Sequence, residues 1–98
     1  MQIPKSMKVG PMRYTIKQVR RLVPEHRAGR VFLGVGLVEL STHTRNGRQR
    51  KPQDVAQILW HEMTHAILHD MGHPLNRNEK FVEEFSQRLN QAIHTARF

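Results

Sequence analysis

The sequence contains no cysteine among its 98 residues. This absence excludes disulfides, zinc sites with thiolate ligands and thiol nucleophiles. A metal site in this chain must therefore be built from histidine and carboxylate side chains. A chain without disulfides is compatible with a reducing compartment, so we expect a cytoplasmic protein.

Long hydrophobic runs are also absent. The longest apolar stretch, residues 31–40, is interrupted by Gly34, Gly36 and Glu39. It is too short to cross a bilayer. The first five residues, Met-Gln-Ile-Pro-Lys, lack the apolar core of a signal peptide. We therefore expect no membrane partner.

Acidic residues are few. The chain has 8 Asp and Glu against 16 Lys and Arg, a formal net charge of +8. Such an excess favours an acidic protein or a nucleic acid as partner. Four cations that could bind phosphate lie close together in one polar loop: Arg45, Arg48, Arg50 and Lys51. No aromatic residue interleaves them, so a platform for stacking bases is not predicted.

The length predicts a single domain spanning residues 1–98. Alternation around Tyr14 and Ile16 predicts a strand from residue 12 to 19, and residues 31–40 have the composition of another, with a turn at Pro24 between them. Helical spacing predicts helices over residues 53–71 and 77–95, separated by Gly72 and Pro74. We therefore expect an α+β fold. A small, mostly antiparallel sheet from residues 12–40 would pack on the two helices.

The first predicted helix carries the motif His61-Glu62-Met63-Thr64-His65. Histidines four residues apart lie one turn apart on the same helix face, so both imidazoles can reach one metal ion. Glu62 projects from the neighbouring flank, close enough to hold a water bound to that ion. This H-E-x-x-H pattern indicates two zinc ligands, His61 and His65, and a general base, Glu62.

A catalytic zinc normally has a third protein ligand. Glu79 and Glu83 stand one turn apart on the second predicted helix, and Glu79 lies nearer to its apolar stripe. We therefore predict Glu79 as the third ligand, with Glu83 as a support for a histidine or as the alternative ligand. His69 and His73 remain further alternatives for the third position.

These motifs resemble those of the gluzincins. His61-Glu62-Met63-Thr64-His65, followed by Asn78-Glu79 and by Glu83, is similar to the pattern of thermolysin-like enzymes. The run from Glu79 to Ser86 is also similar to the glutamate helix of ImmA/IrrE-type metallopeptidases, although Val82 and Ser86 stand where that pattern usually has alanine. The resemblance covers about residues 55–93. It implies a zincin-like fold, a Zn²⁺ cofactor, and hydrolysis of a peptide or protein substrate.

The sequence-based hypothesis is thus a zinc-dependent peptide-bond hydrolase in which Glu62 moves the protons. Residues 31–40 could offer a strand edge to an extended peptide. Four residues are candidates for stabilising the oxyanion: Tyr14, His43, His73 and Arg77. The alternative function is a zinc-stabilised basic module that binds nucleic acid or protein without turnover. SprT-like proteases combine both properties, but their third histidine has no clear counterpart here.

Overall fold

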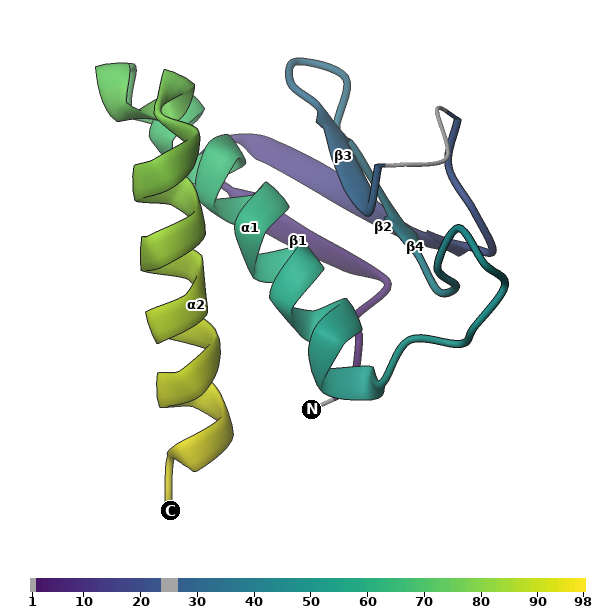
Figure 1. The fold of residues 1–98 in the computed structure, drawn as a ribbon. Helices are drawn as coiled ribbons and strands as arrows, with labels where there is room; N and C mark the ends of the chain where they lie inside the picture. The colour runs from purple at the N-terminus through teal and green to yellow at the C-terminus, as the bar shows by residue number, and fades with distance from the viewer. Residues whose placement is uncertain (1, 24–26) are drawn as a thin grey trace.

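The computed structural model of the protein describes residues 2–23 and 27–98. The predicted turn at Pro24 lies outside these residues. A four-stranded sheet is followed by two helices, with a short 3-10 helix between them (Figure 1). The elements are β1 (Ser6–Val9), β2 (Met12–Val19), β3 (Gly29–Phe32), β4 (Leu37–Ser41), α1 (Pro52–Asp70), η1 (Pro74–Arg77) and α2 (Glu79–Thr95). The predicted α+β class is confirmed.

The sheet is mixed and has the strand order β1-β2-β4-β3. β1 pairs with β2 and β3 with β4 in antiparallel fashion, whereas the central strands β2 and β4 run parallel. Two of the three pairings are thus antiparallel, whereas the predicted extent of the sheet, residues 12–40, needs correction. The sheet begins at Ser6, at the start of β1. β1 was not predicted because a strand of four residues is too short to show a clear alternation of its own.

The apolar stretch of residues 31–40 is a hairpin and not one strand. β3 ends at Phe32 and β4 begins at Leu37. The main-chain carbonyl of Phe32 accepts hydrogen bonds from Val35 and Gly36 N–H, both at 3.2 Å. Gly36 has a φ of 82°, and a Cβ there would lie 2.5 Å from the Arg13 carbonyl oxygen. Glycine is required at this turn for both reasons.

The core lies between α1 and one face of the sheet (Figure 1). The central strands supply four buried side chains and α1 supplies four more. They are Tyr14, Ile16, Val38 and Leu40 from β2 and β4, and Val55, Leu59, Met63 and Ala66 from α1. Ile67 of the same helix is 40% exposed. His61 and His65 of α1 are directed towards η1 and α2.

The helix boundaries differ from the predicted ones by one or two residues. α1 begins at Pro52, whose fixed φ and missing N–H suit a first helical position. α2 begins at Glu79 and not at residue 77, because residues 74–77 form η1 and the Asn78 side chain accepts a hydrogen bond from Phe81 N–H at 2.9 Å. That cap fixes where the first turn of α2 starts, and hence where Glu79 stands.

α2 packs on α1 and contacts no described strand. Val82 and Ser86 are its fully buried residues, whereas Phe85 is 47% exposed. The predicted apolar stripe of this helix is therefore only partly covered. Among the described helices, none combines the length and the apolar character needed to cross a membrane.

Candidate metal centre

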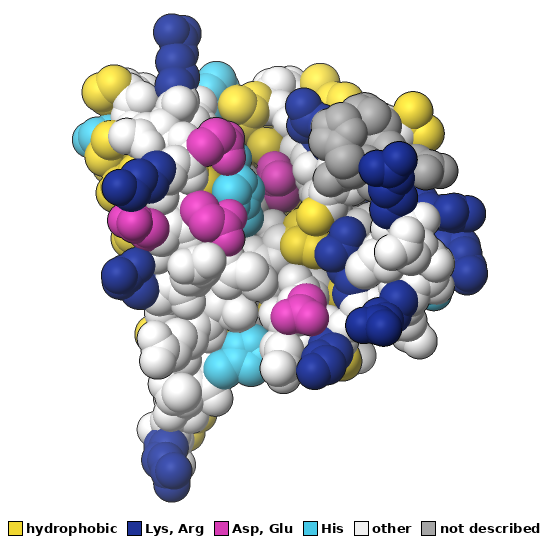
Figure 2. All heavy atoms as spheres, viewed as in Figure 1, with side chains coloured by type: hydrophobic (Ala, Val, Ile, Leu, Met, Phe, Trp, Pro, Cys, Tyr) yellow, Lys and Arg dark blue, Asp and Glu magenta, His cyan; other side chains and the backbone are white. Residues whose placement is uncertain are grey.

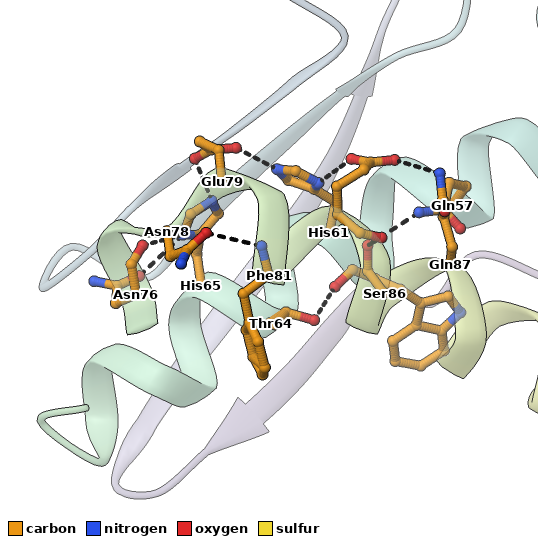
Figure 3. A network of polar contacts seen from close by, with 12 residues as sticks. Gln57, His61, Thr64, His65, Asn76, Asn78, Glu79, Phe81, Ser86 and Gln87 are labelled. Atoms are coloured by element: carbon orange, nitrogen blue, oxygen red, sulfur yellow. Dashed lines mark hydrogen bonds and ion pairs between the residues drawn. The ribbon is translucent and has the colours of Figure 1, made fainter. Parts of the chain in front are cut away.

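α1 carries His61 and His65 one turn apart, and their ring centroids are separated by 5.2 Å. Both side chains are largely covered, with exposed fractions of 18% and 14%. They lie at the junction of α1 with η1 and α2, and the two rings are in edge contact (Figure 3). The helix geometry predicted from the four-residue spacing is thus present.

Glu79, the first residue of α2, reaches both histidines (Figure 3). Its Oε1 atom lies 2.9 Å from His65 Nε2, and its Oε2 atom lies 3.2 Å from His61 Nε2. One ligand atom from each of the three residues falls within 4.8 Å of the others. The structure therefore brings together the three residues predicted as metal ligands, although they come from two helices.

The outer nitrogens of the two rings are held by other groups. His61 Nδ1 lies 2.7 Å from Glu83 Oε2, one turn further along α2. Gln87 Nε2 in turn donates to Glu83 Oε1 at 3.1 Å. His65 Nδ1 lies 3.0 Å from the main-chain oxygen of Asn76 and 2.9 Å from its Oδ1. Each imidazole is thus oriented through the nitrogen that faces away from Glu79.

The hydrogen-bonding capacity of the rings bears on whether a cation fits. A neutral imidazole has one N–H donor and one lone pair. All four ring nitrogens here face oxygen atoms of Glu79, Glu83 or Asn76. If both rings are neutral and donate outward through Nδ1–H, both Nε2 lone pairs face the Glu79 carboxylate, and a cation between them would satisfy these atoms. Such outward bonds are typical of metal-binding histidines.

Glu62 is buried, with 8% of the residue exposed. It faces β3 closely enough that a Cβ on Gly29 would lie 3.3 Å from Glu62 Cγ. Burial raises the pKa of Glu62 and the Glu79 carboxylate adds to the rise, while the two histidines and Arg27 lower it. A carboxylate with a raised pKa is suited to accept and return a proton near neutral pH.

A cleft of about 790 Å³ opens beside these residues, between α1, α2 and β3. Figure 2 shows acidic and histidine side chains gathered in the groove between the helices and the sheet. Its polar lining includes the proposed ligands His61, His65 and Glu79. Its apolar lining consists of Ala28, Gly29, Val31, Leu33 and Ile58. The cleft offers room for a substrate next to the candidate ligands.

Three residues at this cleft were not found from the sequence: Arg27, Gln57 and Asn76. Arg27 precedes β3, and Asn76 belongs to η1. Gln57 lies one turn before His61 on α1 and donates to Ser86 Oγ at 3.0 Å. Because Gln57 shares the helix face of His61, the sequence spacing could have indicated that Gln57 lies at the cleft. Arg27 and Asn76 carry no sequence pattern that points to the centre.

The other candidates lie elsewhere in the fold. His69 is exposed, and His73 caps η1 by accepting a hydrogen bond from Leu75 N–H at 3.1 Å. Tyr14 belongs to the core, and neither His43 nor Arg77 lines the cleft. The four residues expected to help an oxyanion are therefore not at the candidate centre. Sequence spacing does not reveal which loops approach a helix, so the sequence alone could not show that these candidates lie away from the centre.

The basic loop lies apart from the candidate metal centre. Arg45, Arg48 and Lys51 are exposed, whereas Arg50 is partly buried and donates to Ser41 Oγ at 3.1 Å. A β-bridge between His43 and Gln49 closes the loop. None of the four predicted phosphate-binding cations lines the cleft.

A scan against models of known protein families, and searches of curated proteins and of solved structures, gave no match for this chain. The functional conclusion therefore depends on the residues and geometry of the site.

Proposed function

We propose that the protein is a zinc-dependent metallopeptidase with a zincin-like centre. The observation that carries this proposal is the convergence of His61 Nε2 and His65 Nε2 on the Glu79 carboxylate, at 3.2 and 2.9 Å. This donor set of two imidazoles and one carboxylate is one that catalytic zinc uses. The buried Glu62 and the adjoining cleft supply the remaining requirements of a hydrolase.

In this proposal His61, His65 and Glu79 hold the ion. Zinc bound there would supply a Lewis acid that polarises a peptide carbonyl and lowers the pKa of water. Glu62 accepts a proton from the attacking water and delivers it to the leaving amine nitrogen. Its burial beside β3 keeps the carboxylate at the wall of the cleft and away from bulk solvent.

β3 is an edge strand of the sheet, and its residues Gly29 and Val31 line the cleft. An extended peptide can add to such an edge through main-chain hydrogen bonds. The apolar wall formed by Val31, Leu33 and Ile58 would then contact the side chains of the substrate. The substrate class supported by this arrangement is an unfolded or flexible protein segment.

The decisive experiment compares wild-type protein with Glu62→Gln. The substitution removes the proton acceptor but none of the proposed ligands, so the variant should retain about one zinc per chain and lose at least about 100-fold in peptide cleavage. Elemental analysis measures the metal, and mass spectrometry of a peptide mixture measures cleavage. Glu84→Gln, the same chemical change on an exposed residue of α2, is the matched control and should behave like wild type.

Two results would contradict parts of the proposal, and a third would favour the alternative function. If the wild-type protein neither retains nor takes up zinc, the proposed metal centre is wrong. If wild type and Glu62→Gln cleave equally well, the proposed role of Glu62 is wrong. Zinc binding with no cleavage of any peptide would favour the alternative function, a zinc-stabilised binding module.

A further inference from the structure

Positive charge is segregated along the chain. Residues 1–51, which form the sheet and the loop after it, contain 12 Lys and Arg but only 2 Asp and Glu. Residues 52–98, which form the helices, contain 4 Lys and Arg and 6 Asp and Glu. The two parts therefore carry formal charges of +10 and −2. The net charge of the protein belongs to its sheet and not to its candidate metal centre.

The alternation of β2 shows where part of this charge lies. Tyr14 and Ile16 are buried under α1, whereas Arg13, Thr15 and Lys17 between and beside them are exposed. Successive side chains of a strand point to opposite faces, so these exposed residues lie on the face that α1 does not cover. Lys8 of β1 is the exposed cross-strand partner of Arg13 and shares that face.

The cations of this outer face are poorly neutralised. Glu39 is opposite both Lys17 and Arg30 in the strand register, and it bonds to Arg30 Nε at 2.6 Å. Within residues 2–23 and 27–98, no carboxylate forms an ion pair with Lys8, Arg13 or Lys17. The side chain of Arg13 instead donates to Ser6 Oγ at 3.1 Å.

The pairing of Lys8 with Arg13 is unfavourable for the fold alone, because like charges directly opposite each other destabilise a sheet. The loop between β4 and α1 adds further cations near the end of β2. His43 N–H donates to the Arg20 carbonyl oxygen at 3.1 Å, which seats the loop containing Arg45 and Arg48 beside that end.

We propose that the outer face of the sheet, formed by Lys8, Arg13 and Lys17 and extended by the loop cations, binds the phosphate backbone of a nucleic-acid duplex. Arg13 and Lys17 are four residues apart on β2, which corresponds to about 13 Å along the strand. Duplex DNA carries one negative charge per about 1.7 Å of its axis, so the face spans several phosphates. Binding of this kind depends on charge and not on base sequence.

Two features favour a duplex over other anionic partners. Phe32 is the exposed aromatic residue of the described strands, and the Arg30 guanidinium lies over its ring at 5.2 Å from the centroid. No free ring is therefore available there for stacking an unpaired base, as single-strand binding normally uses. Stable membrane attachment needs apolar insertion in addition to basic residues, and the three cations Lys8, Arg13 and Lys17 have polar neighbours Ser6 and Thr15 on their face.

The test measures binding of the purified 98-residue protein to a fluorescein-labelled, mixed-sequence 20-base-pair DNA duplex by fluorescence anisotropy. Affinity should fall steeply as salt is raised, because phosphate contacts release counterions. The triple variant Lys8→Gln, Arg13→Gln, Lys17→Gln should bind about tenfold or more weakly at low salt. The matched control is Lys80→Gln, Arg88→Gln, Arg97→Gln, which removes the same charge from exposed residues of the helical part. It should stay within about threefold of wild type.

Several outcomes would overturn this proposal. Equal losses for the two triple variants would mean that only the net charge matters. Tighter binding to the unpaired strand than to the duplex would identify a single-strand site, and tighter binding to phosphatidylserine vesicles would identify a membrane surface. If the triple variant fails to give a folded circular-dichroism spectrum, Lys8→Gln and Lys17→Gln are measured singly. Wild-type affinity in both would then contradict the assignment. Peptide cleavage does not enter this test, so its result is independent of the proposed peptidase activity.

Discussion

Each imidazole of the candidate centre is fixed from its outer nitrogen, which leaves Nε2 directed towards Glu79. The roles of the two glutamates follow from this arrangement. Glu79 approaches both rings, whereas Glu83 approaches only the far side of His61. One carboxylate is placed to bind a metal ion, and the other is placed to orient a ligand.

The difference between these glutamates can be measured in zinc affinity. Glu79→Ala should weaken zinc binding by more than about 100-fold, because it removes a proposed ligand. Glu83→Ala should cost about 10–100-fold, the usual effect of removing a partner that orients a ligand. Glu84→Ala, which changes an exposed neighbour, should bind like wild type. Competition against a chromogenic chelator gives all three affinities, and the reverse order would make Glu83 the ligand.

Tyr14 gives a separate prediction about the core. Burial raises the pKa of Tyr14 above its ordinary value of 10.0, and the nearby Asp70 carboxylate adds to the rise. The folded state thus favours the neutral phenol. This contribution to the free energy of unfolding is complete below about pH 10 and is lost as the pH rises through the raised pKa.

Tyr14 is the only tyrosine in the chain, so tyrosinate absorbance reports on it alone. The folded protein should titrate at a higher pH than the protein in denaturant. Asp70→Asn should lower the folded midpoint, and Tyr14→Phe should weaken the fall in stability above about pH 10. A folded midpoint at or below that of the denatured chain would contradict the burial argument.

The elements that the sequence predicts well are those with a long, regular pattern. β2 shows its alternation over eight residues, and α1 shows helical spacing over 19. The order of the strands was not predictable, because the parallel pairing of β2 with β4 joins segments about 20 residues apart without a local signal. The same limit applies to the candidate centre. Residues within the H-E-x-x-H motif were identified, whereas Asn76 and Arg27 come from a short helix and a loop whose positions depend on tertiary packing.

The spacing between α1 and β3 depends on Gly29. A Cβ at this position would collide with Ile58 Cγ2 and would press on Glu62 Cγ. Gly29→Ala should therefore destabilise the fold by about 1–3 kcal/mol, the usual cost of overpacking. Urea denaturation monitored by circular dichroism measures this loss.

A double-mutant cycle with Ile58→Ala tests the cause. Ile58→Ala removes the methyl group that the new Cβ would meet, so the double variant should be more stable than the sum of the two single effects predicts. Strict additivity would show that the cost of Gly29→Ala arises elsewhere, for example from the backbone of β3.

The molecule as a whole consists of a cationic sheet with its core under α1, and a second helix that, among the described elements, contacts α1 and η1. The few fully buried residues of α2, Val82 and Ser86, give it limited packing. The candidate centre spans the junction of the two helices, since its histidines belong to α1 and Glu79 belongs to α2. Metal binding should therefore be coupled to the stability of the whole fold.

This coupling gives the last prediction, which concerns the melting temperature. A ligand that binds only the folded state at about 1,000 times its Kd adds about 4.1 kcal/mol to the free energy of unfolding. For a domain of this length each kcal/mol corresponds to roughly 4–8 °C, so saturating zinc should raise the Tm by about 15 °C or more. Differential scanning calorimetry with and without zinc measures the shift. Glu62→Gln should show the full rise, because Glu62 is not a ligand, whereas Glu79→Ala should show only a small part of it. An equal rise in wild type and Glu79→Ala would mean that zinc does not join the two helices through Glu79, and the third ligand would have to be sought on another residue.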